Sequence, residues 1–375
     1  MLKKGIVVGL ILSLLLPFSV AAEETIPLSS LSAVLYEPET GRVLYEKDPD
    51  TKRPMASTTK LMTALVAADC LPMDKTVTIP EAAVLVEGSS MGLRGGDTIT
   101  VRDLVTGMLL SSGNDAANAV ALLSAGSLPS FAVRMNQKAT ALGMSRSVFV
   151  TPSGLDEGEH GSTARDMALL GAEILKVPVL ASMCAAKQAT VNISGRSVTL
   201  TNHNRLLSLY EPTIGLKTGF TKKSGRCLVS AAQRAGVTLV IATLNGGDYW
   251  NDHIALYEYG FSQTESVELP LPELAPLSVA GGVSSTVALQ ASAPTPITLL
   301  KGESASVICR VERPAFEWAP VKAGEPLGRI VYELNGKALR EVPITAVQTV
   351  DERTPMSFLK KWMRQVQRLL TTILR

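Results

Sequence analysis

Cysteine and histidine are scarce in this chain, which has four cysteines and three histidines among 375 residues. Cys70, Cys184, Cys227 and Cys309 show no paired spacing, so we expect buried thiols rather than a disulfide framework. A Cys70–Cys184 or a Cys184–Cys227 bridge remains possible. No His or Cys cluster has the spacing of metal ligands, and we expect neither a metal site nor a cofactor.

A strong net charge is also missing, because the formal value is only +2. The excess of base comes from the two ends of the chain, at Lys3 and Lys4 and in a tail from Pro355 that has no acid. The body between them is mildly acidic. A nucleic-acid-binding protein usually carries a basic patch or stripe, so we expect no nucleic-acid partner.

The N-terminus has the pattern of a secretory signal peptide. Lys3 and Lys4 precede an uncharged segment from Gly5 to Ala22, which ends in small residues. The alternative is an uncleaved membrane span, but the apolar core 6–16 is short for about 30 Å of hydrocarbon. We therefore expect residues 1–22 to be removed and the mature protein to work outside the cytoplasm.

The composition changes near residue 265. Before it, helical periodicity occurs over 58–70, 101–110, 115–123 and 165–175, and 237–244 is typical of a buried strand. After it, short strands are indicated over 283–289, 297–300, 305–311 and 328–332, with a hairpin turn at Asn335-Gly336. We predict an α/β domain over 23–264, a β-rich domain over 265–352 and a C-terminal helix within 353–375.

Three short motifs can together form a serine acyl-transfer site. In Ser57-Thr58-Thr59-Lys60, the serine and the lysine are three residues apart and share a helix face, so the amine can reach the hydroxyl. A serine needs such a base, and a lysine is a base only when burial or a second cation lowers its pKa. Taken alone, the motif favours a simpler interpretation, a helix start with a surface lysine.

The second motif, Ser112-Gly113-Asn114, lies between two predicted helices. A loop there can present the Ser112 hydroxyl for proton relay and the Asn114 amide for binding a substrate amide. The same residues also suit a simple turn and helix cap.

The third motif is Lys217-Thr218-Gly219, followed by Phe220. It is typical of a sheet edge to which an extended peptide adds as a further strand, and Gly219 leaves room for that peptide. Lys217 and Thr218 can hold a carboxylate by charge and hydroxyl, and Lys217 can supply the second cation near Lys60. The alternative is an exposed hairpin.

In this order and context, the motifs resemble the D-alanyl-D-alanine carboxypeptidases among the low-molecular-mass penicillin-binding proteins. The resemblance runs from about Ala33 to Phe261 and looser similarity continues beyond it. Its segments are Tyr45-Glu46-Lys47-Asp48-Pro49, Arg53 to Thr63, Ser111 to Ala117, Thr151-Pro152-Ser153-Gly154-Leu155, Ser162 to Met167 and Gly215 to Gly219.

The resemblance implies a β-lactamase-like α/β fold with helices on both sides of an antiparallel sheet. It implies Ser57 as the acyl-enzyme nucleophile, Lys60 as its base, and Ser112 with Asn114 across the cleft. Lys217, Thr218 and Gly219 would face the carboxylate of a peptidoglycan stem peptide ending in D-Ala-D-Ala, and β-lactams would acylate Ser57. The backbone N–H groups of Ser57 and Phe220 would form the oxyanion hole; some members have histidine where this chain has Phe220.

Three alternatives are weaker. A Ser-His-Asp hydrolase has no motif here, since Gly-x-Ser-x-Gly is absent. A β-lactamase of the glutamate-dependent class needs a Glu-x-x-x-Asn arrangement that Glu157 and Glu159 do not provide. An inactive wall-binding scaffold would usually have lost at least one residue needed for the chemistry. All four such residues are present, namely Ser57, Lys60, Ser112 and Lys217.

The tail predicts a basic amphipathic helix. Its apolar residues fall on one face, at Leu359, Trp362, Met363, Val366, Leu369, Leu370, Ile373 and Leu374, and its five cations lie opposite, at Lys360, Lys361, Arg364, Arg368 and Arg375. Such a helix lies in the interface of a membrane. We expect it to hold the protein at the outer face of the bacterial cytoplasmic membrane, although a helix docked on the protein itself is the alternative.

Overall fold

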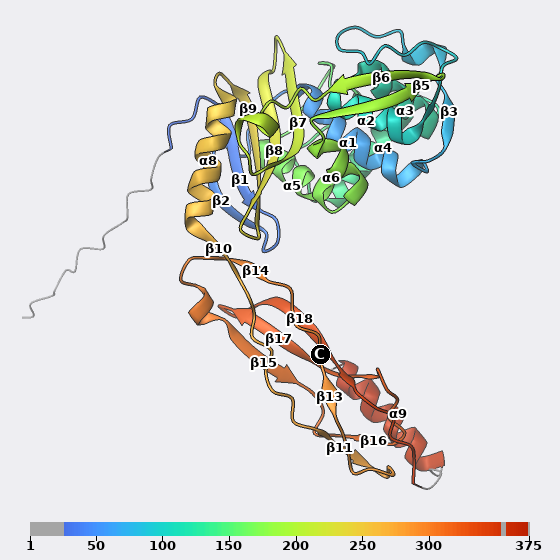
Figure 1. The fold of residues 1–375 in the computed structure, drawn as a ribbon, viewed down its shortest axis with the longest axis vertical. Helices are drawn as coiled ribbons and strands as arrows, with labels where there is room; N and C mark the ends of the chain where they lie inside the picture. The colour runs from blue at the N-terminus through green and yellow to red at the C-terminus, as the bar shows by residue number, and fades with distance from the viewer. Residues whose placement is uncertain (1–25, 354–357, 374–375) are drawn as a thin grey trace, which may run out of the picture.

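The computed structural model describes residues 26–353 and 358–373, and within the last helix the side chains of residues 362–369. Figure 1 shows an elongated molecule with an α/β part, from β1 to α8, at one end and a β-rich part, from β10 to β18, at the other. The predicted signal peptide, residues 1–22, lies outside the described residues.

An antiparallel sheet with the strand order β2-β1-β9-β8-β7 organises the α/β part. Its strands are β1 (Ser32–Glu37), β2 (Arg42–Lys47), β7 (Thr213–Thr221), β8 (Gly225–Arg234) and β9 (Val237–Gly246). Alternate residues of β9 join different hydrophobic clusters, Val240 and Ala242 on the α5 side and Leu239 and Ile241 on the α8 side. Both faces are therefore covered, and β7 is left at an edge.

Helices cover both faces of the sheet, as the resemblance implied. They are α1 (Lys60–Cys70), α2 (Val101–Leu110), α3 (Asn114–Ala125), α4 (Leu128–Ala141), α5 (Ala164–Leu175), α6 (Pro178–Ala185), α7 (Leu206–Leu209) and α8 (Tyr249–Gln263). Two small hairpins flank them, β3 (Thr76–Thr78) with β4 (Thr98–Thr100) and β5 (Gln188–Ile193) with β6 (Arg196–Thr201). In the described part of the chain no single helix is long and apolar enough to cross a membrane. Two bent helix pairs, α3–α4 and α5–α6, reach the necessary length and apolar composition only when the two helices are taken together.

The β-rich part contains nine short strands within the described residues. They are β10 (Thr264–Val267), β11 (Leu277–Ala280), β12 (Thr286–Val287), β13 (Leu289–Gln290), β14 (Ile297–Leu300), β15 (Ile308–Glu312), β16 (Phe316–Trp318), β17 (Pro326–Leu334) and β18 (Lys337–Ala346). The predicted turn connects β17 to β18, with Asn335 and Gly336 at φ of 52° and 78°. Both values lie in the left-handed region that such a two-residue turn requires.

Ion pairs join the two parts of the molecule. Arg42 on β2 contacts Glu303 at 2.6 Å, and Arg340 on β18 contacts Glu39 at 2.5 Å. Strand β10 follows α8 directly and pairs with β14, so the connection is short and hydrogen-bonded.

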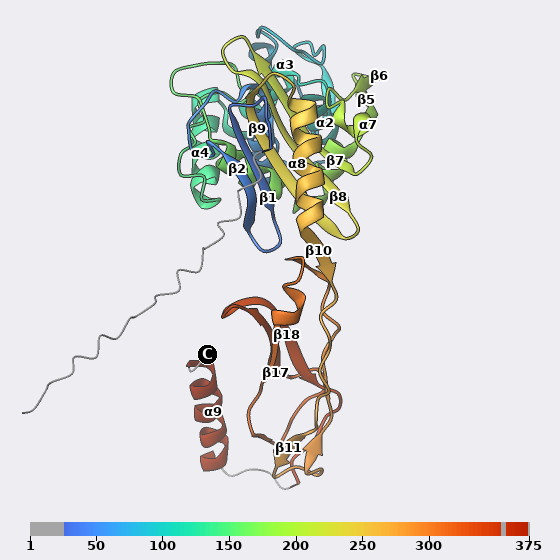
Figure 2. The same cartoon turned by 90° about the vertical axis from the view of Figure 1, so that its left-hand side faces the viewer.

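The C-terminal helix α9 (Phe358–Ile373) docks through its polar side. Arg368 contacts Glu325 at 2.5 Å, and the Trp318 indole N–H donates to the Gln367 side chain at 3.1 Å. Apolar side chains point away from the protein, with Trp362 55% and Leu369 57% exposed. Figure 2 shows α9 beside the β-rich part, far from the five-stranded sheet of the α/β part.

The four cysteines are all free thiols, so neither possible bridge forms. Cys184 and Cys227 are buried as expected, but Cys70 is half-buried and Cys309 is exposed. The expectation of burial is wrong for Cys309 because β15 lies at the edge of its sheet, where most of its residues face solvent.

Candidate active site

Ser57 lies in a single 3-10 turn (Ala56–Thr59) that leads into α1, whose first residue is Lys60. The sequence predicted one continuous helix here. The tighter turn arises beside Ala56, which has a φ of 48° that side chains rarely adopt. The Lys60 amine lies 2.8 Å from the Ser57 hydroxyl, so the two residues meet as their spacing predicted.

Lys60 is fully buried and its amine has three acceptors. Besides Ser57 Oγ, it donates to Asn114 Oδ1 at 2.7 Å and to the Ser153 carbonyl at 2.6 Å. A protonated lysine has three hydrogens, so this set saturates it. When the amine is neutral, two donations remain and the third direction offers a lone pair to the Ser57 O–H.

The surroundings favour that neutral form. Burial, followed by the positive charge of Lys217, holds the pKa of Lys60 well below its ordinary value. Lys217 is itself 1% exposed, and burial lowers its pKa to about 8. The exposed-hairpin alternative for this segment is therefore wrong.

Lys217, Thr218, Gly219 and Phe220 all lie on the edge strand β7. The strand runs close to the serine turn, since a Cβ placed on Gly219 would lie 3.0 Å from the Ser57 nitrogen and 2.8 Å from the Met55 carbonyl oxygen. Such distances admit only glycine. The Phe220 side chain is 64% exposed, and the Arg226 guanidinium lies 5.9 Å from its ring centre.

The second motif lies between α2 and α3, with Asn114 as the first residue of α3. Asn114 is held at both ends of its amide, because its Nδ2 donates to the Glu87 carbonyl at 2.7 Å while its Oδ1 accepts from Lys60. Ser112 is 5% exposed and has a φ of 60°. Its hydroxyl makes no hydrogen bond to the residues that the structure describes, which leaves it available to a substrate.

Sequence reasoning missed the backbone partners of this site. The carbonyls of Ser153 and Glu87 hold Lys60 and Asn114, yet a backbone carbonyl has no signature in a sequence. Asp115 was also missed; its carboxylate accepts hydrogen bonds from the backbone N–H groups of Met91 and Leu93 and so fixes the loop that contains Glu87.

His160 fixes the other loop, the one that contains Ser153. Its Nδ1 accepts from the Val150 backbone N–H at 2.9 Å, so the proton of the neutral ring lies on Nε2, which faces Thr59 Oγ1 at 2.9 Å. Burial lowers the pKa of His160 to about 4, which keeps the ring neutral. Its contact with Thr59 ties this loop to the turn that contains Ser57.

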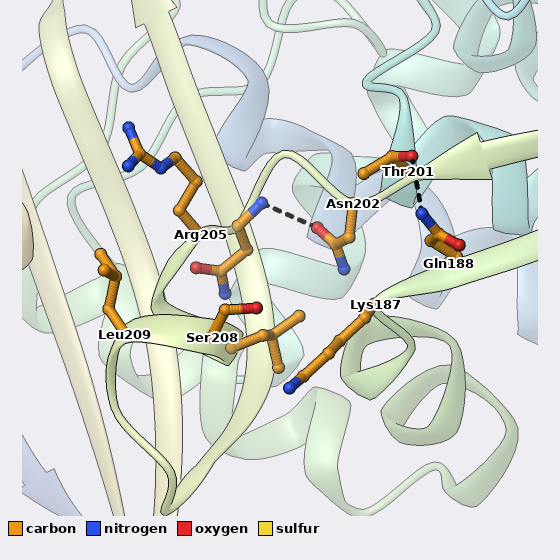
Figure 3. Close-up of a pocket in the computed structure, with 9 residues that line it drawn as sticks. Lys187, Gln188, Thr201, Asn202, Arg205, Ser208 and Leu209 are labelled. Atoms are coloured by element: carbon orange, nitrogen blue, oxygen red, sulfur yellow. Dashed lines mark hydrogen bonds between the residues drawn. The ribbon is translucent and has the colours of Figure 1, made fainter.

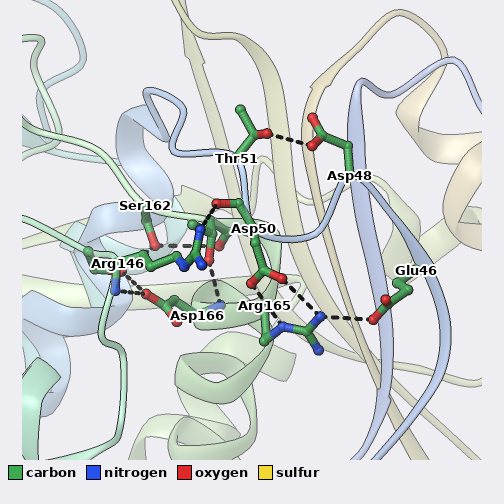
Figure 4. Close-up of polar contacts among 10 residues, drawn as sticks. Glu46, Asp48, Asp50, Thr51, Arg146, Ser162, Arg165 and Asp166 are labelled. Carbon is green, nitrogen blue, oxygen red and sulfur yellow. Dashed lines mark hydrogen bonds and ion pairs between the residues drawn. The ribbon is translucent and has the colours of Figure 1, made fainter.

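Behind the serine turn, a polar network anchors the segment that leads into it (Figure 4). Arg165 on α5 pairs with Asp50 at 3.0 Å and with Glu46 at 2.9 Å. The backbone N–H of Arg53 donates to the Ser162 carbonyl at 2.8 Å. The approach to Ser57 is therefore held from two sides. Within the described residues, no group of three His, Cys, Asp or Glu side chains could hold a metal ion.

Comparison with known proteins agrees with this geometry. The D-alanyl-D-alanine carboxypeptidase family matches residues 19–247, and the penicillin-binding protein 5 C-terminal domain matches residues 273–352. The chain is 30% identical to the D-alanyl-D-alanine carboxypeptidase DacF of Bacillus subtilis, over 96% of this chain and 97% of that one. It is 33% identical to DacC of Escherichia coli, over 94% and 92%.

Solved structures resemble this chain over both of its parts. Penicillin-binding protein 5 from Haemophilus influenzae superposes with a TM-score of 0.66 at 29% identity, covering 88% of this chain and 99% of the other. The likeness extends over the catalytic sheet and the β-rich part together. With the serine, the two lysines and the asparagine gathered beside an edge strand, the chain belongs to the D-alanyl-D-alanine carboxypeptidase family of serine peptidases.

Proposed function

We propose that Ser57 is the residue acylated when this D-Ala-D-Ala carboxypeptidase removes the terminal D-alanine from a peptidoglycan stem pentapeptide. The observation that carries the proposal is the 2.8 Å contact between Ser57 Oγ and a buried Lys60 whose pKa is lowered. Neutral Lys60 takes the hydroxyl proton as Oγ attacks the carbonyl of the penultimate D-alanine.

The terminal carboxylate of the substrate is assigned to Lys217 and Thr218. Charged Lys217 has no acidic partner among the described residues, and its one hydrogen bond goes to the Thr218 carbonyl at 3.1 Å. The peptide would lie along the free edge of β7, beside the serine turn whose close approach the missing Cβ of Gly219 permits. The oxyanion would accept hydrogen bonds from the backbone N–H groups of Ser57 and Phe220.

Ser112 and Asn114 complete the cycle. The unpartnered Ser112 hydroxyl would pass a proton from Lys60 to the departing D-alanine amine, and Asn114 would hold Lys60 in line. Binding of a substrate amide by Asn114 requires that the Glu87 carbonyl release its Nδ2. Water then hydrolyses the ester, with Lys60 as base, and restores the free serine.

The test is incubation with benzylpenicillin, followed by mass spectrometry and peptide mapping. We expect a stable adduct on the peptide that contains Ser57 and none in Ser57→Ala. Rapid consumption of penicillin without an adduct would instead indicate a β-lactamase. An adduct on any other serine would refute the assignment.

We further propose that the protein is exported by residues 1–22 and held at the outer face of the cytoplasmic membrane by α9. Support for the anchor comes from the exposed Trp362, Met363 and Leu369, which form an apolar surface on a helix whose Arg364 and Arg368 pair with Glu317 and Glu325 of the β-rich part. Removal of residues 355–375 should release the enzyme to the soluble fraction with unchanged activity. Retention of the truncated protein in the membrane fraction would disprove the anchor.

A further inference from the structure

Asp115 lies in the first turn of α3, directly after the Ser112-Gly113-Asn114 motif. It is only 1% exposed, and both of its carboxylate oxygens accept hydrogen bonds. A carboxylate, which only accepts, suits such a set of donors, whereas an amide would turn its own N–H groups toward some of them. The donors, at 2.5 to 3.1 Å, are the Ser90 hydroxyl and the backbone N–H groups of Met91, Gly92, Leu93 and Ala116.

The loop that Asp115 gathers positions Asn114 in turn. The Ser89 carbonyl accepts from the Asn114 backbone N–H, and the Glu87 carbonyl accepts from its Nδ2, both at 2.7 Å. Asn114 Oδ1 then accepts from the Lys60 amine, also at 2.7 Å. Asp115 is therefore connected to Lys60, the base of the reaction, through the loop and through Asn114.

The glycine of the motif makes room for this carboxylate. A Cβ on Gly113 would lie 2.7 Å from Asp115 Oδ1 and 3.1 Å from the Met91 backbone nitrogen, so any side chain there would separate this donor from its acceptor. The φ of Gly113 is −57°, which every residue adopts, so the close approach and not the backbone conformation requires glycine. The motif and the carboxylate thus form one structural unit.

The other side of the motif is held by backbone and amide groups. Two residues before Ser112, the Leu110 carbonyl accepts from the His203 backbone N–H at 3.2 Å. The corner at 202–204 is fixed by Asn202, whose Oδ1 accepts from the Asn204 backbone N–H at 2.9 Å (Figure 3). Asp115 differs from these supports because it holds the motif with a full charge.

The negative charge of Asp115 acts on Lys60. Burial and then the charge of Lys217 on β7 lower the pKa of Lys60, whereas the charge of Asp115 on α3 raises it. His160 also lies close enough to interact with Lys60, but burial lowers the pKa of His160 to about 4 and keeps the ring neutral. A fixed negative charge favours the protonated amine, which is the form that Lys60 takes when it removes the Ser57 proton.

We propose that Asp115 is a positioning residue for acylation: through its loop it holds Asn114 against Lys60, and its charge stabilises the Lys60 cation that forms in this step. The inference rests on the proposed function. As Ser57 Oγ bonds to the substrate carbonyl carbon, the carbonyl electron pair moves onto its oxygen and the hydroxyl proton moves to Lys60 Nζ. The hydrogen bonds of Asp115 act before the reaction, and its charge acts while the proton moves.

The test is the pH dependence of acylation by benzylpenicillin, measured by stopped flow in Asp115→Asn and Asp115→Glu. Asp115→Asn loses the charge and some of the acceptors, so the maximal rate should fall about ten- to hundredfold. Because the pKa of Lys60 falls when the charge is removed, the rising limb of the profile should move to lower pH. Asp115→Glu keeps the charge, so its rising limb should stay at the wild-type position. Hydrolysis of an N-acylated tripeptide ending in D-Ala-D-Ala should show the same shift.

Two further variants separate the charge from the structure. Ser90→Ala removes one donor to the same carboxylate and leaves the charge in place, so acylation should slow about threefold without a shift in pH. Asp252 is the matched control, since it is also buried in the first turn of a helix and also accepts from another segment, through N–H and O–H groups of Ser29 and Ser30. Asp252→Asn should lower the unfolding temperature and leave the acylation profile unchanged.

A rising limb of Asp115→Asn at the wild-type position would overturn the proposal, because a loss of structure alone lowers the rate without shifting the profile. A maximal rate within about threefold of wild type would overturn it as well. If Asp115→Asn does not fold, Ser90→Ala decides, and an unchanged acylation rate in that variant overturns the proposal. Absence of a penicillin adduct in the wild type would instead refute the proposed function together with this inference.

Discussion

Charge is arranged differently at the catalytic centre of the α/β part and on the surface of the β-rich part. Lys60 and Lys217 are buried in the first, and neither is hydrogen-bonded to a carboxylate among the described residues. In the β-rich part, Arg329 pairs with Glu312 at 2.8 Å and with Glu341 at 2.9 Å, and all three side chains remain partly exposed. Surface pairs of this kind contribute little to stability.

The buried, unpaired lysines serve catalysis, whereas the paired surface arginines serve the structure. A cation without an acidic partner is costly to bury, and it is retained where a proton must move or a carboxylate must bind. A paired surface cation orients neighbouring elements at low cost. Substitutions in the two regions should therefore have opposite signatures in activity and stability.

The largest effect should come from Lys60→Met. Loss of the base should lower the rate of penicillin acylation by about 10²–10⁴-fold. Stability should not increase, because Asn114 Oδ1 and the Ser153 carbonyl lose their donor inside the protein. Stopped-flow acylation and thermal unfolding measure the two quantities, and an acylation rate within threefold of wild type would contradict the role of Lys60.

Lys217→Met should lower the activity of the enzyme and raise its stability. We expect a loss of about 10²-fold in kcat/KM, since the carboxylate loses its charged partner. The free energy of unfolding at pH 7 should rise by up to about 3 kcal/mol, as the folded-state pKa is about 8 rather than 10.5. The gain should be complete below pH 8 and disappear as the pH rises toward 10.5, because only a charged lysine opposes burial. Chemical denaturation at pH 7 and pH 10 tests this.

The dependence of kcat/KM on pH tests whether the two buried lysines, Lys60 and Lys217, interact. In wild type, kcat/KM should rise as Lys60 deprotonates and fall above about pH 8 as Lys217 loses its charge. In Lys217→Met, the rising limb should move to higher pH, because the cation that lowers the pKa of Lys60 is gone. An unshifted rising limb would show that the two lysines do not interact.

His160→Ala should have a smaller effect, because His160 acts through the loop it fixes. Without its ring the Val150 N–H loses its acceptor and the Ser153 loop loosens, so acylation should slow about tenfold. His160→Gln, which can both donate and accept, should restore part of the rate. Equal losses in both variants would argue against hydrogen bonding as the cause.

The smallest effect should come from the junction. Arg340→Met removes a partly exposed pair with Glu39 and should cost at most about 1 kcal/mol of stability, less at high salt. Tripeptide hydrolysis should be unchanged, because the junction is far from Ser57. A large loss of tripeptide activity would show that the β-rich part acts on the catalytic site.

Much of the catalytic geometry could be predicted from sequence, because the relevant contacts are local. The three-residue spacing of Ser57 and Lys60 and the turn at Asn335-Gly336 both depend on neighbours in the chain. Contacts such as those of Ser153, Glu87 and His160 depend on loops from distant segments, and no periodicity encodes them. Helices α4, α6, α7 and α8 were not predicted; α6 and α7 span only eight and four residues that are nearly all apolar, so they offer too little sequence for a helical period to be recognised.

The orientation of one side-chain amide has a consequence for the ageing of the protein. Asn114 directs its oxygen to Lys60 and its nitrogen to the Glu87 carbonyl, so only an amide satisfies both. Hydrolysis to aspartate would preserve the shape and place an oxygen against that carbonyl, with a negative charge beside Lys60. The lysine would hold its proton more tightly and cease to act as a base. Spontaneous deamidation at this one position would yield a folded but inactive protein.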